Sequence, residues 1–456
     1  MGKLVSLRQA IRLKDDCQLA VVGSGGKTTA LFSIARDFSG VVLVSCSTHL
    51  STDQASLADR HFIVRSVDDL SKILLNIGQG VILFTGAPVA EQRLAGLPED
   101  IFFQLHRYAK EQHVPLLIEA DGSRGLPLKA PAEHEPAISA WADHVAVLCG
   151  MQGLYQPLES QHVHRPERFS LLCGLPAGAE ITPAAVACVA THPSGGLKRI
   201  PPLARRSLIL NQADTEILQS AAKEIAQDVV RQYHEVVIAT LNQPQKPVQA
   251  VFSKTAGIIL AAGSSSRMGT INKLLLNWDG EPFIRKIVRT ALLSGLDPVI
   301  IVTGWQAEAV QAAAGDLKFR IVNNEQWQAG QSTSVRKGIE AVPANCGAAI
   351  FLLGDQPQVT PTVLTALTEQ HYLSQSAIIA PLVDGMRANP VLFDRETFHD
   401  LTQLRGDVGG RAIFSKYPVD WLPWHDVLLL RDVDTAEQYA QLLQLQNNLS
   451  GDTDEH

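Results

Sequence analysis

The residues best suited to chemistry lie in two glycine-rich segments far apart in the chain. The first, QLAVVGSGGKTTALFSIA, joins an apolar run to a helical pattern through a turn. Glycines let a phosphate approach the backbone, a helix N-terminus favours anions, and lysine and threonine side chains can reach a terminal phosphate and a Mg²⁺ ion. The segment predicts a P-loop-like site for ATP or GTP, with Thr28 as a metal ligand and with phosphate contacts from Gly23, Gly25, Gly26, Lys27, Thr28 and Thr29. A structural glycine turn is the alternative, and Val21 stands where the P-loop pattern has its first glycine.

The second segment, GIILAAGSSSRMGTINKLLLNWDG, begins as a buried strand and continues into a loop of small residues that also contains one arginine and one lysine. A triphosphate needs unobstructed backbone N–H groups and fixed positive charge. The segment therefore predicts a nucleotide site formed by Ala261, Ala262, Gly263, Ser264, Arg267, Gly269 and Lys273. A flexible Ser/Gly turn is the alternative. Neither GK[ST] nor G-x-G-x-x-G follows this strand, which disfavours an ATPase or a dehydrogenase in this half.

Acidic residues follow another apolar run in PLLIEADGSRGLPLKAPAEHEP. A carboxylate at the end of a parallel strand is well placed to hold Mg²⁺, so Asp121 is predicted as a metal ligand, and Glu119 could orient a nucleophile. The loop that follows is rich in charge, which suggests a second ligand site, with a solvated loop as the alternative. Its charged residues are Arg124, Lys129, His134 and Glu135.

Two weaker patterns lie further along the same half. Asn211 and Asp214 in SLILNQADT have the N-x-x-D spacing that some P-loop proteins use to read a base, but an Asp that caps a helix after a strand gives the same letters and is the favoured interpretation. His162 and His164 could ligate a metal, but an alternating histidine pair in a loop is more often exposed or substrate-facing, so neither is assigned as a ligand.

Short Val-, Ile- and Leu-rich runs position these residues and alternate with helical patterns along the whole chain. Such runs are typical of strands buried on both faces, so the sequence predicts an α/β protein with parallel sheets. The rhythm breaks in TLNQPQKPVQAVFSK, residues 240–254. We predict a P-loop-like domain over residues 1–243, a second nucleotide-binding domain over residues 254–448 and a frayed acidic tail over residues 449–456.

Composition excludes several classes of partner. The 456 residues carry 39 Lys and Arg against 46 Asp and Glu, a net charge of -7, and contain no basic block, which argues against a nucleic acid ligand. The six cysteines are scattered without a C-x-x-C pair, as in a reduced cytosolic protein. No signal peptide and no long uncharged apolar stretch is evident, so we expect a cytoplasmic protein with no membrane partner.

The C-terminal half resembles the MobA/MocA-like molybdopterin nucleotidyltransferases, which have a nucleotide-diphospho-sugar, GT-A-like (Rossmann-like) transferase fold. The resemblance rests on L-A-A-G-x-S-x-R-M-G, on AAIFLLGDQPQVT, on RANPVLF and on RGDVGGRAI followed by RDVDT. It implies that Asp355 and Asp434 hold Mg²⁺, that Arg267, Lys273 and Asp355 are catalytic, and that the acceptor contacts Arg387, Asn389 and Pro390. Ala388 stands where the family usually has glycine, which leaves the shape of the acceptor pocket open.

Within that family, the A-A-G form of the opening, with Ala262, resembles the members that use CTP rather than GTP. The resemblance therefore implies that CMP is transferred from CTP to molybdopterin and that pyrophosphate is released. In QAGQSTSVRKGIEA, Ser332 and Ser334 could either hydrogen-bond the base or cap a helix.

The N-terminal half resembles the YqeC-type accessory proteins for selenium cofactor biosynthesis or selenium-dependent hydroxylases, and its shortened glycine loop resembles that of Mur-type ligases. Together the two resemblances imply a maturation protein for molybdenum hydroxylases, with CTP and molybdopterin as substrates and the apo hydroxylase as a candidate partner. Two other functions stay open. One is nucleotidyl transfer to a sugar or polyol phosphate, and the other is a non-catalytic carrier or insertion chaperone for the cofactor.

Overall fold

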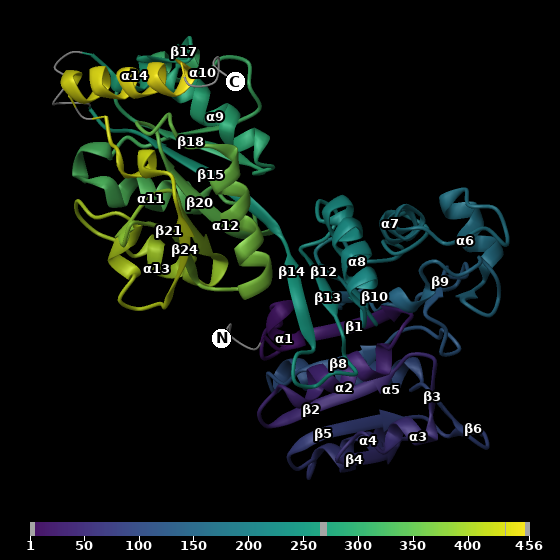
Figure 1. The fold of residues 1–456 in the computed structure, drawn as a ribbon. Coiled ribbons are helices and arrows are strands. Elements are labelled where there is room, and N and C mark those ends of the chain that lie inside the picture. The colour runs from purple at the N-terminus through teal and green to yellow at the C-terminus, as the bar shows by residue number, and fades with distance from the viewer. Residues whose placement is uncertain (1–4, 265–270, 434, 452–456) are drawn as a thin grey trace. The chain divides into compact units, whose positions relative to one another are not determined.

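The protein is described by a computed structural model over residues 5–264, 271–433 and 435–451 (Figure 1). The chain divides into two compact units, here called the N-terminal unit, which extends to Phe252, and the C-terminal unit, which begins at Ser253. Both units have the α/β architecture with parallel strands that the sequence predicts.

The N-terminal unit is built on a nine-stranded sheet with the order β14-β13-β12-β10-β1-β8-β2-β5-β4. All neighbouring pairs are parallel except β13 and β14. The strands are β1 (Gln18–Gly23), β2 (Val41–Cys46), β4 (Arg60–Ile63), β5 (Gly80–Thr85), β8 (Leu116–Glu119), β10 (His144–Gly150), β12 (Arg205–Asn211), β13 (Glu235–Ala239) and β14 (Val248–Phe252).

Helices connect these strands, and the apolar residues of β1, β2 and α2 form part of one continuous core. The helices are α1 (Leu7–Ala10), α2 (Lys27–Arg36), α3 (Thr52–Ala55), α4 (Val67–Leu74), α5 (Glu99–Glu111), α6 (Pro166–Cys173), α7 (Pro183–Thr191) and α8 (Glu216–Val229). Two small sheets complete the unit: β3 (His49–Ser51), β7 (Arg93–Ala95) and β6 (Pro88–Ala90) form one, and β9 (Leu128–Lys129) and β11 (Val163–His164) form the other.

The segment where the sequence rhythm breaks contains β14, the last strand of the N-terminal unit. β14 pairs antiparallel with β13, and its Val248 and Val251 side chains belong to the core of that unit. The apolar residues between the prolines and Ser253 therefore extend the first sheet, and the two units divide directly after them.

The C-terminal unit contains an eight-stranded mixed sheet with the order β19-β18-β15-β20-β23-β21-β22, in which β24 also pairs with β21. β15 lies between β18 and β20 and is parallel to both, whereas β23 is antiparallel to β20. The strands are β15 (Lys254–Ala261), β18 (Val299–Thr303), β19 (Arg320–Asn323), β20 (Cys346–Leu353), β21 (Ile378–Val383), β22 (Met386–Arg387), β23 (Val391–Asp394) and β24 (Val419–Trp424). A separate hairpin pairs β16 (Asn277–Trp278) with β17 (Glu281–Pro282).

Two apolar clusters cover the two faces of this sheet, since alternate residues of β15 and β20 enter different clusters. The helices are α9 (Phe283–Leu293), α10 (Ala307–Ala314), α11 (Gln331–Glu340), α12 (Pro361–Ser374), α13 (Phe398–Thr402) and α14 (Ala436–Gly451). α14 continues to Gly451, into the segment predicted as a frayed tail, and residues 452–456 lie outside the described part of the chain. No helix in the described ranges is long and apolar enough to span a lipid bilayer.

Candidate nucleotide sites

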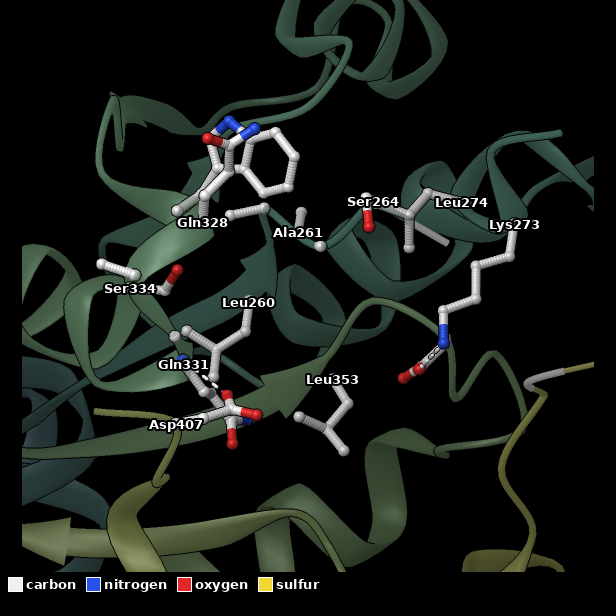
Figure 2. Close-up of a pocket in the computed structure, with 16 residues that line it drawn as sticks. Leu260, Ala261, Ser264, Lys273, Leu274, Gln328, Gln331, Ser334, Leu353 and Asp407 are labelled. Atoms are coloured by element: carbon white, nitrogen blue, oxygen red, sulfur yellow. Dashed lines mark hydrogen bonds and ion pairs between the residues drawn. The ribbon is translucent and has the colours of Figure 1, made fainter. Parts of the chain in front are cut away.

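The C-terminal unit has a pocket of about 580 Å³ where β15 and β20 end (Figure 2). Because the two strands are parallel neighbours, their carboxyl ends lie at the same edge of the sheet. The predicted residues Ala261, Ala262, Gly263, Ser264, Lys273, Ser334 and Asp355 all line this pocket. The structure thus brings together residues that are far apart in the sequence.

Lys273 and Asp355 face each other across one side of the pocket. Lys273 begins a short 3-10 turn, η3 (Lys273–Leu275), whose start is capped by the Asn272 side chain. The Lys273 ammonium group donates a hydrogen bond to the carboxylate of Asp355, which follows β20. Figure 2 draws this contact beside Lys273. Both side chains are partly exposed to the pocket. The pair therefore offers a cation for phosphate oxygens and a carboxylate for a divalent cation.

The opposite side of the pocket is formed by the start of α11, where Figure 2 shows Gln331, Ser334 and Asp407. Gly330 caps the helix with a φ of 108°, and the Gln331 amide donates a hydrogen bond of 3.0 Å to Asp407 Oδ1. A carboxylate at a helix N-terminus is favourably placed. The hydrogen bond to Asp407 holds the loop that follows α13 beside the pocket.

The position of the helix cap tests one of the two interpretations of the serines. Ser332 and Ser334 lie inside α11, so neither is its N-cap, and the helix-cap interpretation is wrong. Ser334 lines the pocket, and its hydroxyl accepts a hydrogen bond of 3.0 Å from Asn324 Nδ2. Ser332 is buried outside the pocket lining, and its hydroxyl has no hydrogen-bond partner among the described residues.

Several predicted residues are not brought to the pocket. Arg387 lies exposed on β22, and Asn389 and Pro390 follow it; none of the three lines the pocket. Arg267, Gly269 and Asp434 lie outside the described residues. Trp327, Gln328, Gln331 and Asp407, by contrast, line the pocket without having been predicted. Asp407 belongs to RGDVGG, a motif that could have identified it.

In the N-terminal unit, three glycines of the loop between β1 and α2 have left-handed backbone. Gly23, Gly25 and Gly26 have φ values of 95°, 82° and 106°, which favour glycine. A Cβ atom on Gly25 would lie 2.3 Å from Gly150 Cα on β10, so only glycine fits there. Lys27 begins α2, whose first amides have no side-chain cap. These amides are therefore available to an anion.

Lys27 and Thr28 point toward the acidic end of β8. Lys27 Nζ donates hydrogen bonds to Gly23 O (3.0 Å) and Ser123 Oγ (3.1 Å), and it lies 3.6 Å from Glu119 Oε1. The Thr28 hydroxyl donates a hydrogen bond of 2.8 Å to Glu119 Oε2. Burial raises the pKa of Glu119, while the charge of Lys27 opposes this shift. Thr28 is thus paired with Glu119, whereas the sequence predicts Asp121 as its companion.

The carboxylate of Asp121 is hydrogen-bonded to other groups of the protein. It accepts hydrogen bonds from the Gly23 amide, at 3.1 and 3.2 Å, and from Lys129 Nζ, at 2.7 Å. Lys129 also donates to Glu135 at 3.0 Å, and Arg165 contacts both oxygens of Glu135 at 2.8 and 3.0 Å. Burial acts to raise the pKa of Glu135, but Arg165 and Lys129 lower it to about 2. Asp121 therefore ties the glycine loop to this buried ion-pair network.

Asn211 also holds the glycine loop in place. Its Nδ2 donates a hydrogen bond of 2.7 Å to Gly25 O, and its Oδ1 accepts one of 3.1 Å from the Leu241 amide. The favoured interpretation of Asp214 as a helix cap is wrong, because the cap of α8 is Thr215, one residue closer to the helix. Asp214 accepts a hydrogen bond from Gln152 instead.

Asn211→Ala should loosen the glycine loop, because it leaves the buried Gly25 carbonyl without this donor. We expect amide hydrogen exchange in residues 23–29 to rise about tenfold, with exchange in the C-terminal unit unchanged. Mass spectrometry of the exchanged full-length protein measures this. The matched control is Asp214→Ala, which alters the same turn without touching the loop. Equal exchange in wild type and Asn211→Ala would show that Asn211 does not hold the loop.

The predicted second ligand site is only partly brought to the cavity beside the glycine loop. This cavity of about 890 Å³ is lined by Arg124, His134, Glu135 and His164, together with Gly26, Lys27, Thr28, Thr29 and Glu119. Lys129 does not line the cavity, because it is buried in the ion-pair network with Asp121 and Glu135. In the described ranges, no group of three or more His, Cys, Asp or Glu residues has the arrangement of a metal site.

Comparisons with known proteins match each unit separately. The model of the family "MobA-like NTP transferase domain" matches residues 257–421, and the model of the family "YqeC protein" matches residues 19–167. The nicotine blue oxidoreductase of Paenarthrobacter nicotinovorans is 31% identical over 41% of this chain and 95% of its own length. The uncharacterized protein YqeC of Escherichia coli K12 is 32% identical over 50% of this chain and 88% of its own length.

Among solved structures, Rv0371c of Mycobacterium tuberculosis is 29% identical and covers 42% of this chain and 98% of its own, with a TM-score of 0.39. The two curated relatives are each matched over most of their length, one by each half of the chain. The chain is therefore a fusion whose N-terminal unit belongs to the YqeC family and whose C-terminal unit belongs to the MobA-like NTP transferase family, a family of nucleotidyltransferase-type enzymes.

Proposed function

We propose that the C-terminal unit transfers CMP from CTP to the phosphate of molybdopterin and releases pyrophosphate. One observation carries the proposal: the backbone of residues 261–264, Lys273 and Asp355 line one pocket where β15 and β20 end. Membership of the MobA-like NTP transferase family supports the reaction class.

The protein has to supply little covalent chemistry for this transfer. An oxygen of the acceptor phosphate forms a bond to the α-phosphorus of CTP, and the bond from that phosphorus to the bridging oxygen breaks. The electron pair leaves with pyrophosphate, and no proton has to be moved. Positioning and positive charge near the phosphates can supply most of the rate enhancement. Lys273 is placed to do this, with Arg267 as its predicted companion.

Asp355 suits a divalent cation, since hard cations such as Mg²⁺ prefer carboxylate oxygens and this carboxylate lines the pocket. We propose that Asp355 and Asp434 hold the ion. When bound, Mg²⁺ would neutralise part of the negative charge on the phosphates. The Lys273 ammonium group forms an ion pair with the carboxylate of Asp355.

The choice of CTP and of molybdopterin rests on the resemblance of the A-A-G opening and of RANPVLF. Of the two serines of α11 that are predicted to contact a base, Ser334 lines the pocket and Ser332 does not. Arg387, Asn389 and Pro390 lie outside the lining, so an acceptor that meets them must extend beyond the pocket toward β22.

For the N-terminal unit we propose an ATP or GTP site at Gly26, Lys27, Thr28 and Thr29, which line the cavity. Gly23 and Gly25, which the sequence also predicts as phosphate contacts, do not line it, because their amides donate to Asp121 and to the Leu126 carbonyl. The close pairing of Thr28 with Glu119 favours these two oxygen donors for Mg²⁺ over Asp121, which Lys129 already engages. This unit would act as an accessory module in the maturation of a molybdenum hydroxylase.

The test is an incubation of the full-length protein with Mg²⁺, molybdopterin and either CTP, GTP or ATP, followed by mass spectrometry and a pyrophosphate assay. We expect a product one CMP heavier than molybdopterin, with CTP preferred. Binding of CTP and molybdopterin without pyrophosphate would identify a carrier. Because one relative is named an oxidoreductase, parallel incubations with NADH and NADPH are needed. Consumption of either without nucleotidyl transfer would overturn the proposal.

Gly330→Ala should impair the transfer without unfolding the unit. A Cβ atom on Gly330 would lie 2.6 Å from Gly406 O and 2.7 Å from Asp407 N, so the start of α11 and the backbone at Asp407, which both line the pocket, must move apart. We expect pyrophosphate formation to fall at least about tenfold. Gly295→Ala is the matched control, since Gly295 also has a positive φ but has no atom within 4 Å of the added Cβ. Wild-type turnover in Gly330→Ala would separate the α11 start from the active site.

A further inference from the structure

The cavity of the N-terminal unit extends well beyond the glycine loop. Besides the loop and α2, its lining includes residues after β2, on β3 and β7, in the loop after β8 and on β11. Figure 1 shows β3 and β6 at one edge of this unit, close to α3. Residues on these peripheral elements thus share a cavity with the predicted phosphate cradle.

The charge in this cavity is positive although the whole chain is acidic. The described lining includes four lysine and arginine side chains, Lys27, Arg93, Arg124 and Arg165, but only two carboxylates, Glu119 and Glu135. The chain as a whole has a net charge of -7. A local excess of cations in a concave site attracts anions and favours their binding.

Internal pairing shows which of these cations are available to a ligand. Arg165 is committed to both oxygens of Glu135, and Lys27 lies between Glu119 and Asp121 at the glycine loop. Arg93 and Arg124 are exposed, and neither side chain forms an ion pair or hydrogen bond with another residue in the described ranges. Two guanidinium groups from different segments therefore face the cavity unpaired.

Two hydroxyl groups in the same cavity are also without partners. Ser47 and Thr48 follow β2 and line the cavity, and their hydroxyl oxygens are buried with no hydrogen-bond partner within the described part of the chain. A buried polar group without a partner is costly unless something else satisfies it. Rotation of these two side chains toward the cavity would let both hydroxyls donate to a bound anion.

The pKa of His164 reflects its burial and the positive charges around it. Burial, together with the charges of Arg165, Lys129 and Arg124, lowers the pKa of His164 to about 4, so the imidazole is neutral at pH 7. His164 lines the same cavity. Arg124 thus contributes to the positive charge around His164 in this cavity.

We propose that this cavity binds a second anion, a small phosphomonoester, at a subsite formed by Ser47, Thr48, Arg93 and Arg124. The subsite lines the same cavity as Gly26, Lys27, Thr28 and Thr29, so a phosphomonoester there would share the cavity with the nucleotide, and this part of the inference rests on the proposed nucleotide site. A phosphomonoester fits better than a carboxylate because its three terminal oxygens can accept from two guanidinium groups and two hydroxyls together.

The test uses the full-length protein saturated with Mg²⁺ and a non-hydrolysable ATP analogue, so that the glycine loop is filled. Methyl phosphate is then titrated by calorimetry. We expect wild type to bind methyl phosphate, and Arg93→Ala and Arg124→Ala each to weaken this binding at least about tenfold, with the affinity for the ATP analogue changed less than about twofold. Arg124→Lys should recover part of the loss. Arg107→Ala, an exposed substitution on α5 outside the cavity, is the control.

Three results would overturn the proposal: methyl phosphate that binds only in competition with the ATP analogue, equal binding by wild type and both alanine variants, or acetate bound as tightly as methyl phosphate. Because the C-terminal unit also accepts phosphates, the difference between wild type and the arginine variants is the diagnostic quantity. If the ATP analogue does not bind wild type, the proposed nucleotide site fails, while a loss of methyl phosphate binding in the arginine variants would still support the subsite.

Discussion

Asp355→Asn should abolish nucleotidyl transfer while leaving the C-terminal unit folded. Asp355 lies directly after β20, where its carboxylate lines the pocket and contacts Lys273. The substitution keeps the shape of the side chain but removes the charge that we propose holds Mg²⁺. Loss of such electrostatic stabilisation is worth several kcal/mol, so turnover should fall roughly a hundred- to a thousandfold.

The measurement is pyrophosphate release at saturating CTP and at several Mg²⁺ concentrations, with circular dichroism to verify folding. Glu369→Gln is the matched control, because it neutralises an exposed carboxylate on α12 that does not line the pocket. If Asp355→Asn keeps near-normal turnover at saturating Mg²⁺, Asp355 has no part in the mechanism.

The second large effect concerns the independence of the two proposed nucleotide sites. Lys27 and Lys273 lie in separate units, each beside its own strand end and its own small-residue loop. Lys27→Ala should remove ATP or GTP binding from the N-terminal unit but leave cytidylyl transfer intact, and Lys273→Ala should do the reverse. Removing one charge-assisted phosphate contact costs about 1.5–3 kcal/mol, or roughly ten- to a hundredfold in affinity.

Titration of labelled CTP, ATP and GTP into wild type and both variants measures this independence. Lys223→Ala is the control for the N-terminal unit, since Lys223 is exposed on α8 and does not line the cavity. A single nucleotide stoichiometry that either lysine substitution abolishes would contradict separate sites.

The fold could be predicted from the sequence because the apolar runs are strong signals. Runs such as QLAVVG and AAIFLLG are buried on both faces of their sheets and cannot be mistaken for amphipathic helices. The loops at their ends could be predicted for the same reason, since a phosphate cradle needs a strand, glycines and a lysine in sequence order. Lys27, Thr28 and residues 261–264 accordingly lie at strand or helix ends beside the two cavities.

The remaining site residues depend on contacts that no local pattern encodes. Asp121 and Glu119 are two residues apart, yet only Glu119 contacts Thr28, because Lys129 and the Gly23 amide engage Asp121. Asn211 holds Gly25 across 186 positions of the chain. Long-range pairs of this kind become visible only once the sheet is assembled.

Arg93 and Ser47 also carried no local signal. β3 follows Thr48 directly and pairs with β7, which brings the Arg93 segment into the same cavity. A lone arginine in a short strand and a serine after a buried run are ordinary features of a sequence, and only the cavity relates them to each other.

The most direct test of the central claim follows the position of the label in the product. The full-length protein is incubated with Mg²⁺, molybdopterin and CTP that carries radioactive phosphorus either at the α or at the γ position. The account predicts that the α label appears in the molybdopterin product and the γ label in pyrophosphate, with Lys27→Ala behaving as wild type. A γ label in the product, or no label in it from either CTP, would contradict nucleotidyl transfer to molybdopterin.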